Sequence, residues 1–304
     1  MTAERSAFPD GRWHFRHGPM DIVIGAEGEP RAIRDAHEAA WHRFVPLLGE
    51  LVAELPGLRL PVHPTDACPF TGPVARRMWH ACHPYRDYFI TPMAAVAGSV
   101  AEELIAFYCR EGVSRAWVNN GGDIALHLTA HESVSIGLYS DLSRFDERQV
   151  RHGLDIDARF MVSGSLPIRG VATSGWRGRS FSLGIADSVT VLAQTAAAAD
   201  AAATMIANAV DCDDARIVRR PASEIKDDSD LGDIEVTVAV PPLDAGLVEQ
   251  ALRRGGRRAG ELRAAGLIWS AALVCQGQVL TTIDDDFVSR LVPGAPMERS
   301  STVH

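Results

Sequence analysis

The spacing of hydrophobic residues changes several times along the chain, and each change marks a predicted element. Residues 30–55 place apolar side chains three and four positions apart, which predicts an amphipathic helix with a kink at Pro46. Short apolar runs bounded by glycine, proline or asparagine predict strands instead. Further helices are expected over residues 74–83, 92–110, 195–210 and 244–265, and strands over 13–15, 21–24, 115–119, 124–128, 133–139, 170–175, 187–193 and 234–240, with a last hairpin around 276–277.

Other segments show no clear hydrophobic period. Residues 56–72 contain four prolines and predict a loop, and residues 140–170 are polar and irregular. The acidic residues of 211–232 predict an exposed linker, and residues 294–304 predict a disordered tail. The alternating strands and helices indicate one domain over residues 1–304, with a core over about residues 12–283.

Charge and lysine content exclude several functions. The chain has 30 basic and 39 acidic side chains, which gives a formal net charge of −9. Its only lysine, Lys226, lies in an acidic run, which is unfavourable for the desolvated amine of a Schiff-base enzyme. A Gly-Lys-Ser/Thr phosphate loop is absent, and the acidic balance argues against nucleic-acid binding, which needs a basic surface.

Cysteine usage and hydropathy concern the cellular location. The five cysteines form no Cys-x-x-Cys pair and predict free thiols. No stretch approaches the roughly 18 apolar residues of a membrane span, and the polar N-terminus lacks the apolar centre of a signal peptide. We therefore expect a cytoplasmic protein with no membrane contact.

The first candidate for chemistry is Asn119-Asn120-Gly121-Gly122-Asp123, which follows a predicted strand. Two glycines let the backbone turn sharply and let a ligand approach the main chain, beside polar side chains that form hydrogen bonds. Asn-Gly between apolar strands is also the strongest short hairpin signal. The residues alone leave a ligand-binding turn and a plain hairpin open.

The second candidate is Thr173-Ser174-Gly175, at the end of another predicted strand. Two hydroxyl groups and a glycine at a strand end can donate hydrogen bonds to a phosphate. The same residues can form a turn by bonding to their own backbone. Both interpretations stay open at this point.

The third candidate is the pair Asp200 and Thr204 in a helix made almost wholly of alanine. Four residues apart, the two side chains share one helix face, and their small neighbours leave room for a bulky group. A carboxylate and a hydroxyl suit a hard cation such as Mg²⁺. The alternative is a solvated aspartate on a helix that packs closely through its alanines.

A fourth group consists of residues of metal-binding type, His63, Cys68, His80, Cys82 and His83. Their spacing matches no zinc pattern. His80 and His83 are expected to be neighbours on one helix face near a pocket.

Taken in order, segments between about residues 90 and 210 resemble the ApbE-like superfamily, which is named for the FAD:protein FMN transferase. The matching segments are the glycine-containing helix at Met93–Glu102, the Asn-x-Gly-Gly-Asp turn at Val118–Ile124, the Ala-Thr-Ser-Gly segment at Val171–Gly175, the strand Ser188–Val191 and the Ala-Asp-Ala-x-x-Thr helix at Ala199–Thr204. Each motif is weak alone, and their shared order makes the resemblance specific.

The resemblance implies an α+β, ApbE-like fold, with mixed or antiparallel sheets and packed helices around a central nucleotide cleft. It implies FAD and Mg²⁺ as cofactors, with Asp200 and Thr204 as metal ligands and a carbonyl near Ala97 completing the metal site. In the transferase the pyrophosphate of FAD is cut, FMN passes to a hydroxyl of a protein acceptor, and AMP is released. The implied nucleotide-binding residues are Asn119, Asn120, Gly121, Gly122, Asp123, Thr173, Ser174 and Gly175.

The chain departs from the transferase pattern in three places. The transferase has a Lys-Gly-Tyr element where this chain has Ala97-Gly98-Ser99. It also has a histidine soon after Thr-Ser-Gly, where residues 176–182 contain none, and an export signal that is missing here. These features are similar to a cytoplasmic, functionally uncharacterised branch of the superfamily. Arg177 and Arg179 are either phosphate or carboxylate ligands or surface residues of a turn.

Three functions follow from these residues. The first is a Mg²⁺-dependent flavin or nucleotide transferase that acts on a protein acceptor. The second is a binding module, or an enzyme of different chemistry, that uses the same pocket for a flavin or another anionic small metabolite. The third is a structural or interaction protein without a pocket function.

Overall fold

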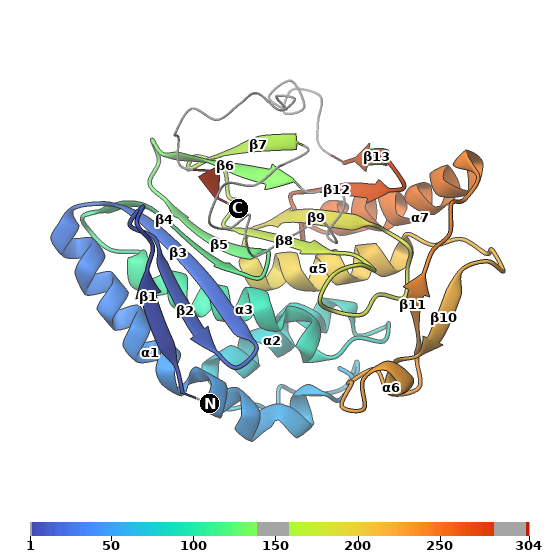
Figure 1. Cartoon of the computed structure of the whole chain (residues 1–304), viewed down its shortest axis with the longest axis horizontal. Coiled ribbons are helices and arrows are strands. Elements are labelled where there is room, and N and C mark those ends of the chain that lie inside the picture. Colours follow the sequence, from blue (N-terminus) through green and yellow to red (C-terminus); the bar gives the residue numbers. More distant parts are fainter. Residues whose placement is uncertain (1, 139–157, 283–301, 304) are drawn as a thin grey trace.

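A nine-stranded antiparallel sheet forms the centre of the molecule (Figure 1). The computed structural model describes residues 2–138, 158–282 and 302–303. In spatial order the strands of the central sheet are β1 (Glu4–Ala7), β2 (Trp13–His17), β3 (Met20–Gly28), β4 (Val113–Asn120), β5 (Asp123–Leu128), β8 (Gly170–Ser174), β9 (Ser188–Ala193), β12 (Ser270–Cys275) and β13 (Gln278–Thr281). Each neighbouring pair is antiparallel. The predicted α+β class, with sheets and packed helices, is confirmed.

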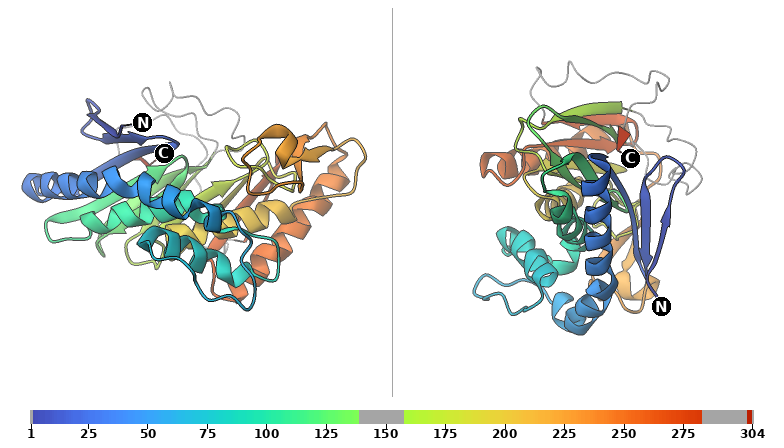
Figure 2. Two further views of the ribbon diagram at one scale, coloured as in Figure 1. Left: turned by 90° about the horizontal axis from the view of Figure 1, so that it is seen from below. Right: turned by 90° about the vertical axis from the view of Figure 1, so that its left-hand side faces the viewer.

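Helices cover one face of this sheet, as the two further views in Figure 2 show. The long helices are α1 (Pro30–Leu58), α2 (Pro73–Cys82), α3 (Val96–Ile105), α5 (Ala196–Ala209) and α7 (Ala245–Ala264). Short 3₁₀ turns accompany them: η1 (His83–Tyr85), η2 (Pro92–Ala95) and η3 (Ala106–Tyr108). Buried residues of α1 recur at intervals of three and four, so the helix period in the sequence marks the face that packs on the sheet.

The opposite face of the central strands is covered by a smaller sheet, β14-β6-β7 (Figure 1). Its strands are β6 (Ser133–Leu138), β7 (Ala158–Ser163) and β14 (Thr302–Val303). A second hydrophobic core lies between the two sheets, with Trp117, Ile124 and Leu192 from the central sheet and Ile136 and Phe160 from the smaller one. Side chains alternate across each central strand, so one strand contributes to both cores.

A third, two-stranded sheet consists of β10 (Val218–Pro221) and β11 (Glu235–Ala239), with the single-turn helix α6 (Ala222–Ile225) between them. The segment 211–232, expected as an exposed linker, therefore contains regular structure, and Ile217 and Ala222 within it are buried. Its polar strand is stabilised by pairing with β11, which the local sequence does not reveal.

Most predicted elements are present, with three differences besides the segment 211–232. The helix expected over residues 92–110 is divided into η2, α3 and η3. Strand β7 lies inside 140–170, where the sequence predicts irregular structure, and most of that segment is outside the described residues. Most of the tail 294–304, which is expected to be disordered, also lies outside them, but its residues Thr302–Val303 form strand β14, which pairs with β6.

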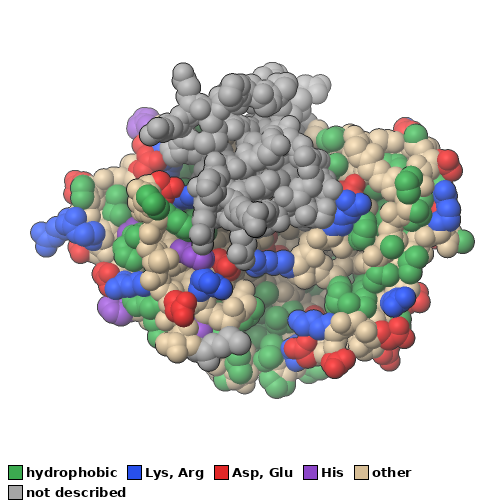
Figure 3. All heavy atoms as spheres, viewed as in Figure 1, with side chains coloured by type: hydrophobic (Ala, Val, Ile, Leu, Met, Phe, Trp, Pro, Cys, Tyr) green, Lys and Arg blue, Asp and Glu red, His purple; other side chains and the backbone are tan. Residues whose placement is uncertain are grey.

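None of the helices in the described part of the chain is both long and apolar enough to cross a membrane. On the face shown in Figure 3, basic and acidic side chains lie interspersed over the described surface.

Candidate functional site

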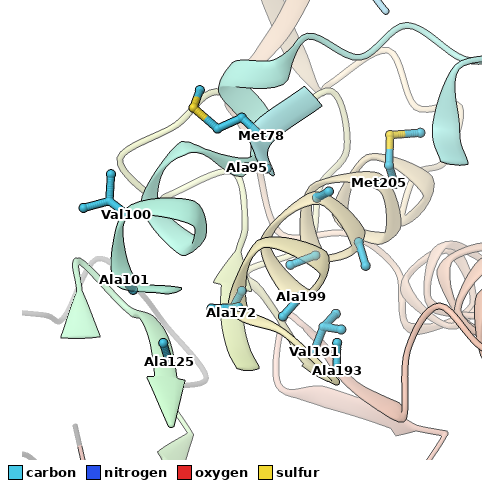
Figure 4. Packing of buried hydrophobic residues seen from close by; sticks show 14 of the residues in the cluster. Met78, Ala95, Val100, Ala101, Ala125, Ala172, Val191, Ala193, Ala199 and Met205 are labelled. Carbon is cyan, nitrogen blue, oxygen red and sulfur yellow. The ribbon is translucent and has the colours of Figure 1, made fainter. Parts of the chain in front are cut away.

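Helix α5 places Asp200 against the start of α3. The helix begins at its N-cap Thr195, whose hydroxyl accepts a hydrogen bond from the Ala198 amide at 3.2 Å. Its alanines pack against Ala172 and Val191 of the sheet (Figure 4). A Cβ at Gly98 would lie 2.3 Å from the Ala196 carbonyl oxygen, so only glycine permits this crossing of α3 and α5.

The Asp200 carboxylate caps α3 from outside that helix. Its Oδ2 accepts a hydrogen bond from the Gly98 amide at 2.9 Å. The N-cap residue of α3 is Ala95, which has no side chain able to accept such a bond. Asp200 is therefore held by the partial positive charge of a helix N-terminus.

The reverse contact holds the two helices in register. Glu102 of α3 accepts a hydrogen bond from the Ala197 amide, in the first turn of α5, at 3.1 Å. The same side chain pairs with Arg77 of α2 at 3.1 Å. Each of the two helices thus supplies a carboxylate to the other's N-terminus, and the exchange fixes the position of Asp200.

The β4–β5 turn lies beside this crossing. Asn120 pairs with Asp123 across a two-residue loop in which Gly121 and Gly122 have φ values of +70° and +112°. This is the conformation of a primed hairpin turn, which favours glycine. The turn is thus a hairpin. The side-chain amide of Asn120 also donates a hydrogen bond to the Ala97 carbonyl oxygen at 3.2 Å. Asn119 accepts a hydrogen bond from the Gly122 amide at 2.8 Å, which stabilises the turn itself.

Strands β5 and β8 separate at the site, and Asp123 occupies the opening. The two strands pair only at Ile124 with Val171 and at Ala125 with Gly170. Beyond that point the Thr173 amide donates to the Asp123 carboxylate at 3.3 Å, in place of a backbone carbonyl. Asp123 thus has a structural partner and points to the helix side of the sheet, where Ala125 also lies.

Asp123 and Asp200 face each other closely enough for their charges to repel. Burial raises the pKa of Asp123 to about 7, against a lowering by the hydrogen bond from Thr173. Burial also raises the pKa of Asp200 well above its usual value, and the charge of Asp123 raises it further. The amides of Gly98 and Ala97 oppose this rise. A pair of carboxylates with raised pKa values is typical of a functional site.

The structure separates the predicted binding residues between the two faces of the sheet. Asn120, Asp123 and Asp200 gather near Ala97 on the helix side. Thr204 lies one turn further along α5 and is partly exposed. Alternation along β8 places Ser174 on the helix side and Thr173 on the other, where its hydroxyl forms a hydrogen bond with that of Thr190 at 2.9 Å.

Gly175 has a packing role at the end of β8. A Cβ there would lie 2.4 Å from the Asp187 carbonyl oxygen. The Asp187 carboxylate in turn accepts hydrogen bonds from the backbone amide of Gln276 at 2.5 Å and from Trp176 Nε1 at 3.3 Å. Arg177 Nε lies 3.8 Å from the same carboxylate. The loop after Thr-Ser-Gly is thus anchored through Asp187, which the sequence motifs did not indicate.

The group of histidines and cysteines does not assemble into a metal site. Within the described ranges, no three His, Cys, Asp or Glu residues are arranged to hold a metal ion. Trp79 packs on the rings of His80 and His83. Cys82 donates to the Thr91 carbonyl oxygen at 3.3 Å, and burial, followed by the charge of Asp200, raises the pKa of its thiol. His80, Cys82 and His83 thus have packing or hydrogen-bonding partners around α2.

Comparisons with known proteins give the family. Residues 5–281 match the family model described as AbpE bacteria. The UPF0280 protein of Methanopyrus kandleri is 34% identical over 224 residues, which are 72% of this chain and 83% of the relative. The UPF0280 protein of Methanosarcina barkeri is 37% identical over 215 residues, which are 68% of this chain and 75% of the relative.

Two solved structures are similar over most of the chain. The ApbE protein of Thermotoga maritima is 14% identical, with a TM-score of 0.46, and the match covers 95% of this chain and 98% of that one. The flavinyl transferase ApbE of Pseudomonas stutzeri is 12% identical, with a TM-score of 0.44, and the match covers 96% of this chain and 97% of that one. Because the family model spans residues 5–281, the chain belongs to the ApbE-like superfamily, in the family described as AbpE bacteria.

Proposed function

We propose that the protein binds FAD or another phosphate-bearing metabolite together with Mg²⁺, at the site formed by α3, α5 and the β4–β5 turn. The observation behind this proposal is that two partly buried carboxylates, Asp200 on the Gly98 amide and Asp123 on the Thr173 amide, come close enough for repulsion between them to raise the pKa of Asp200. A divalent cation would offset that repulsion. Family membership makes a flavin nucleotide the first ligand to test.

The residues present fit a magnesium ion. Asp200 offers a carboxylate, Thr204 a hydroxyl one helical turn away, and Ala97 a carbonyl that accepts the Asn120 hydrogen bond at 3.2 Å. All three donors are oxygen atoms, the type that Mg²⁺ selects, and a few protein ligands leave room for phosphate oxygens. When bound, the ion would neutralise charge on a phosphate leaving group.

The remaining residues act on the ligand directly. No atom of the described residues lies within 4 Å of a Cβ placed at Gly122, so a nucleotide can approach the backbone of the turn there. Asn120 and Asp123 border that position with hydrogen-bonding groups, while the Gly98 amide keeps Asp200 oriented. Ser174, on the same side of the sheet, adds a hydroxyl that can donate to a phosphate.

Transfer of FMN to a protein acceptor is one outcome of such binding, and binding without transfer is the other. The second is favoured by residues 176–182, which contain no histidine. Within this segment Trp176 and Arg177 instead contact Asp187 and anchor the loop. The element Ala97-Gly98-Ser99 likewise lacks the lysine of the transferase. A hydroxyl acceptor would need another base.

Thermal unfolding with FAD and Mg²⁺ tests the binding site. FAD should raise the Tm of the wild type only when Mg²⁺ is present, and Asp200→Asn should remove that rise. Asp35→Asn, an exposed position on α1, makes the same charge change and should behave as the wild type. An equal rise in Tm for Asp200→Asn and wild type would sink the proposal.

Product analysis separates the two outcomes. The wild type is incubated with FAD, Mg²⁺ and a candidate acceptor polypeptide that contains serine and threonine. AMP release and a covalent FMN adduct on the acceptor would establish transfer. FAD binding without either product supports the binding function instead.

A further inference from the structure

Arg77 lies on the side of α2 that packs against α3, and its side chain is only 26% exposed. Its Nε is 3.1 Å from Glu102 Oε1, and its Nη1 is 2.9 Å from Glu103 Oε2. The same Nη1 donates to the Ser99 carbonyl oxygen at 3.3 Å. A planar guanidinium presents its donors at fixed angles, so Arg77 holds one turn of α3 at three points.

Glu102 carries this constraint from α2 to α5. Its Oε1 faces Arg77, while its Oε2 accepts the hydrogen bond from the Ala197 amide at 3.1 Å. Ala197 lies in the first turn of α5, three residues before Asp200, so the two residues are neighbours on one helix face. Arg77 and Asp200 are thus linked through one carboxylate and one helical turn.

The hydrogen bonds between α3 and α5 run in both directions. The Gly98 amide of α3 donates to Asp200 Oδ2 at 2.9 Å, and the Ala197 amide of α5 donates to Glu102. One bond alone would let α5 turn about it, whereas two bonds placed four residues apart on α3 fix the rotation of α5. The direction in which the second carboxylate oxygen of Asp200 points depends on that rotation.

We infer that Arg77 is a positioning residue for Asp200, which sets the affinity of the site for a divalent cation by holding Glu102 against α5. This inference rests on the proposed function, in which Asp200 binds Mg²⁺. Residues that orient a metal ligand from outside its coordination shell typically change metal affinity by about 10- to 100-fold. Arg77 needs no contact with the cation to have such an effect.

Charge alone predicts the opposite effect, and this makes the role of Arg77 testable. The guanidinium lies between two carboxylates, Glu102 and Glu103, so its removal makes the surroundings of the site more negative. A more negative site attracts a cation more strongly. Weaker Mg²⁺ binding in a variant that lacks Arg77 would therefore report lost positioning and not lost charge.

Arg43 of α1 belongs to the same group of charges and offers a comparison. Its Nε is 2.7 Å from Glu103 Oε1, and its Nη2 is 2.7 Å from Glu50 Oε2. Burial acts to raise the pKa of Glu103, but hydrogen bonds from Arg43 and Arg77 lower it below its ordinary value. Arg43 thus ties α1 to α3 through Glu103, whereas Arg77 reaches α5 through Glu102.

Calorimetric titration of the full chain with Mg²⁺, in the presence of excess FAD, measures the effect. Arg77→Gln should weaken Mg²⁺ binding about tenfold or more relative to the wild type. Arg77→Lys keeps the charge but cannot span both glutamates, so it should recover only part of the loss. Arg76→Gln makes the same charge change on α2, at a residue whose Nη1 donates to the Phe70 carbonyl oxygen, and should match the wild type. Arg43→Gln should also bind Mg²⁺ as the wild type does, although urea unfolding should show that it is less stable.

Hydrogen exchange of the protein without ligand gives a second readout, which does not depend on the metal. The Ala197 amide is held by Glu102, so NMR should show that it exchanges at least about tenfold faster in Arg77→Gln than in the wild type. In Arg43→Gln its exchange rate should be close to that of the wild type.

The outcomes separate this inference from the proposed function. Equal or tighter Mg²⁺ binding by Arg77→Gln overturns the role of Arg77 and leaves the proposed function intact, as does unchanged exchange of the Ala197 amide. Equal weakening in Arg77→Gln and Arg43→Gln also overturns it, because a general loss of helix packing would then be the cause. If Arg77→Gln does not fold, Arg77→Lys decides, and Mg²⁺ binding as tight as that of the wild type overturns the inference. If the wild type and Asp200→Asn titrate alike, the proposed metal site itself fails, and this result appears without any change at Arg77.

Discussion

The two faces of the central sheet are built from the same strands but from side chains of different size. On the helix side β4, β5, β8 and β9 each place a buried alanine, namely Ala116, Ala125, Ala172 and Ala193. On the other side the same strands place Trp117, Leu126, Val171 and Leu192. Both faces are apolar, so hydrophobicity alone does not distinguish them.

The difference in size decides where polar groups can meet. Small residues let α5 approach the sheet and α3 approach α5, which brings Asp200 to the Gly98 amide and next to Asp123. On the other side the buried cluster is formed by larger side chains, among them Trp117, Ile136 and Phe160. Close packing through alanine and glycine is thus the condition for the candidate site. The larger side chains pack on the opposite face of the sheet.

Removal of the largest side chain of the bulky core should have the largest effect. Trp117 is 6% exposed and its ring covers Gly25. Trp117→Ala should lower the free energy of unfolding by about 3–5 kcal/mol, because it leaves a cavity that the rigid sheet cannot close. Urea unfolding measures this. Trp269→Ala, at a residue 41% exposed, is the matched control and should cost much less. Equal losses in the two variants would contradict the proposed role of this core.

Acid should destabilise the protein from the helix side. His37 of α1 is 4% exposed, its Nδ1 is 2.6 Å from the Tyr108 hydroxyl, and burial lowers its pKa to about 4. Between pH 6.5 and 4 the unfolded chain binds a proton that the folded protein does not, so stability falls as the pH falls through this range. Between pH 6.5 and 4 the unfolding free energy of the wild type should therefore fall by up to about 3 kcal/mol more than that of His37→Gln.

The unfolding free energies of the wild type and His37→Gln must be compared at each pH, because the contribution of Asp123 to stability changes with pH in the opposite direction. Its pKa is raised to about 7, so its contribution to stability falls as the pH rises from about 4 to 7. That contribution is common to wild type and His37→Gln and cancels in the difference. A difference in unfolding free energy that stays constant between pH 4 and 7 would show that His37 is not responsible.

The close approach of the helices can be broken at one glycine. A Cβ at Gly98 would meet the Ala196 carbonyl oxygen at 2.3 Å and the Asp200 Cβ at 2.9 Å. Gly98→Ala should therefore cost about 1–3 kcal/mol and weaken any Mg²⁺-dependent FAD binding, because α3 and α5 must separate. Gly49→Ala in α1 is the control: it meets no atom within 4 Å and should stabilise the protein by about 0.4–1 kcal/mol. A Gly98→Ala variant as stable as wild type would contradict this packing.

Periodicity predicted much of the fold but not the pairing of weak strands. The β2–β3 hairpin, α1, α5 and α7 follow from apolar spacing and turn residues. Strand β7 alternates correctly at Phe160 and Val162, but only over a few residues in a polar context, so the pattern was too short to predict it. Strand β10 is polar, and its pairing with β11 stabilises it.

The site was predictable only where its residues are close in sequence. Four-residue spacing placed Asp200 and Thr204 on one helix face, and two glycines predicted the turn before Asp123. The contact between Asp200 and the Gly98 amide depends on how two helices cross, and the position of Arg179 beside Gly121 depends on the course of a loop. Neither has a local sequence signal. Alternation along the predicted strand separates Thr173 from Ser174, but it does not indicate which of the two faces the helices.

Asp200 caps a helix as well as facing Asp123, and one substitution can separate these roles. Without metal, Asp200→Asn should change stability by less than about 1 kcal/mol, because the amide still accepts a hydrogen bond and the loss of charge at the helix N-terminus is offset by relief from Asp123. With Mg²⁺ at about 100 times its Kd, the wild type should gain about 2.7 kcal/mol and the variant nothing. Thr195→Ala removes the ordinary cap of α5, so it should lose about 1 kcal/mol yet keep the full gain from Mg²⁺. If urea unfolding shows no gain in wild type, or the same gain in Asp200→Asn, Asp200 is a cap alone and the small-residue face of the sheet serves packing, not metal binding.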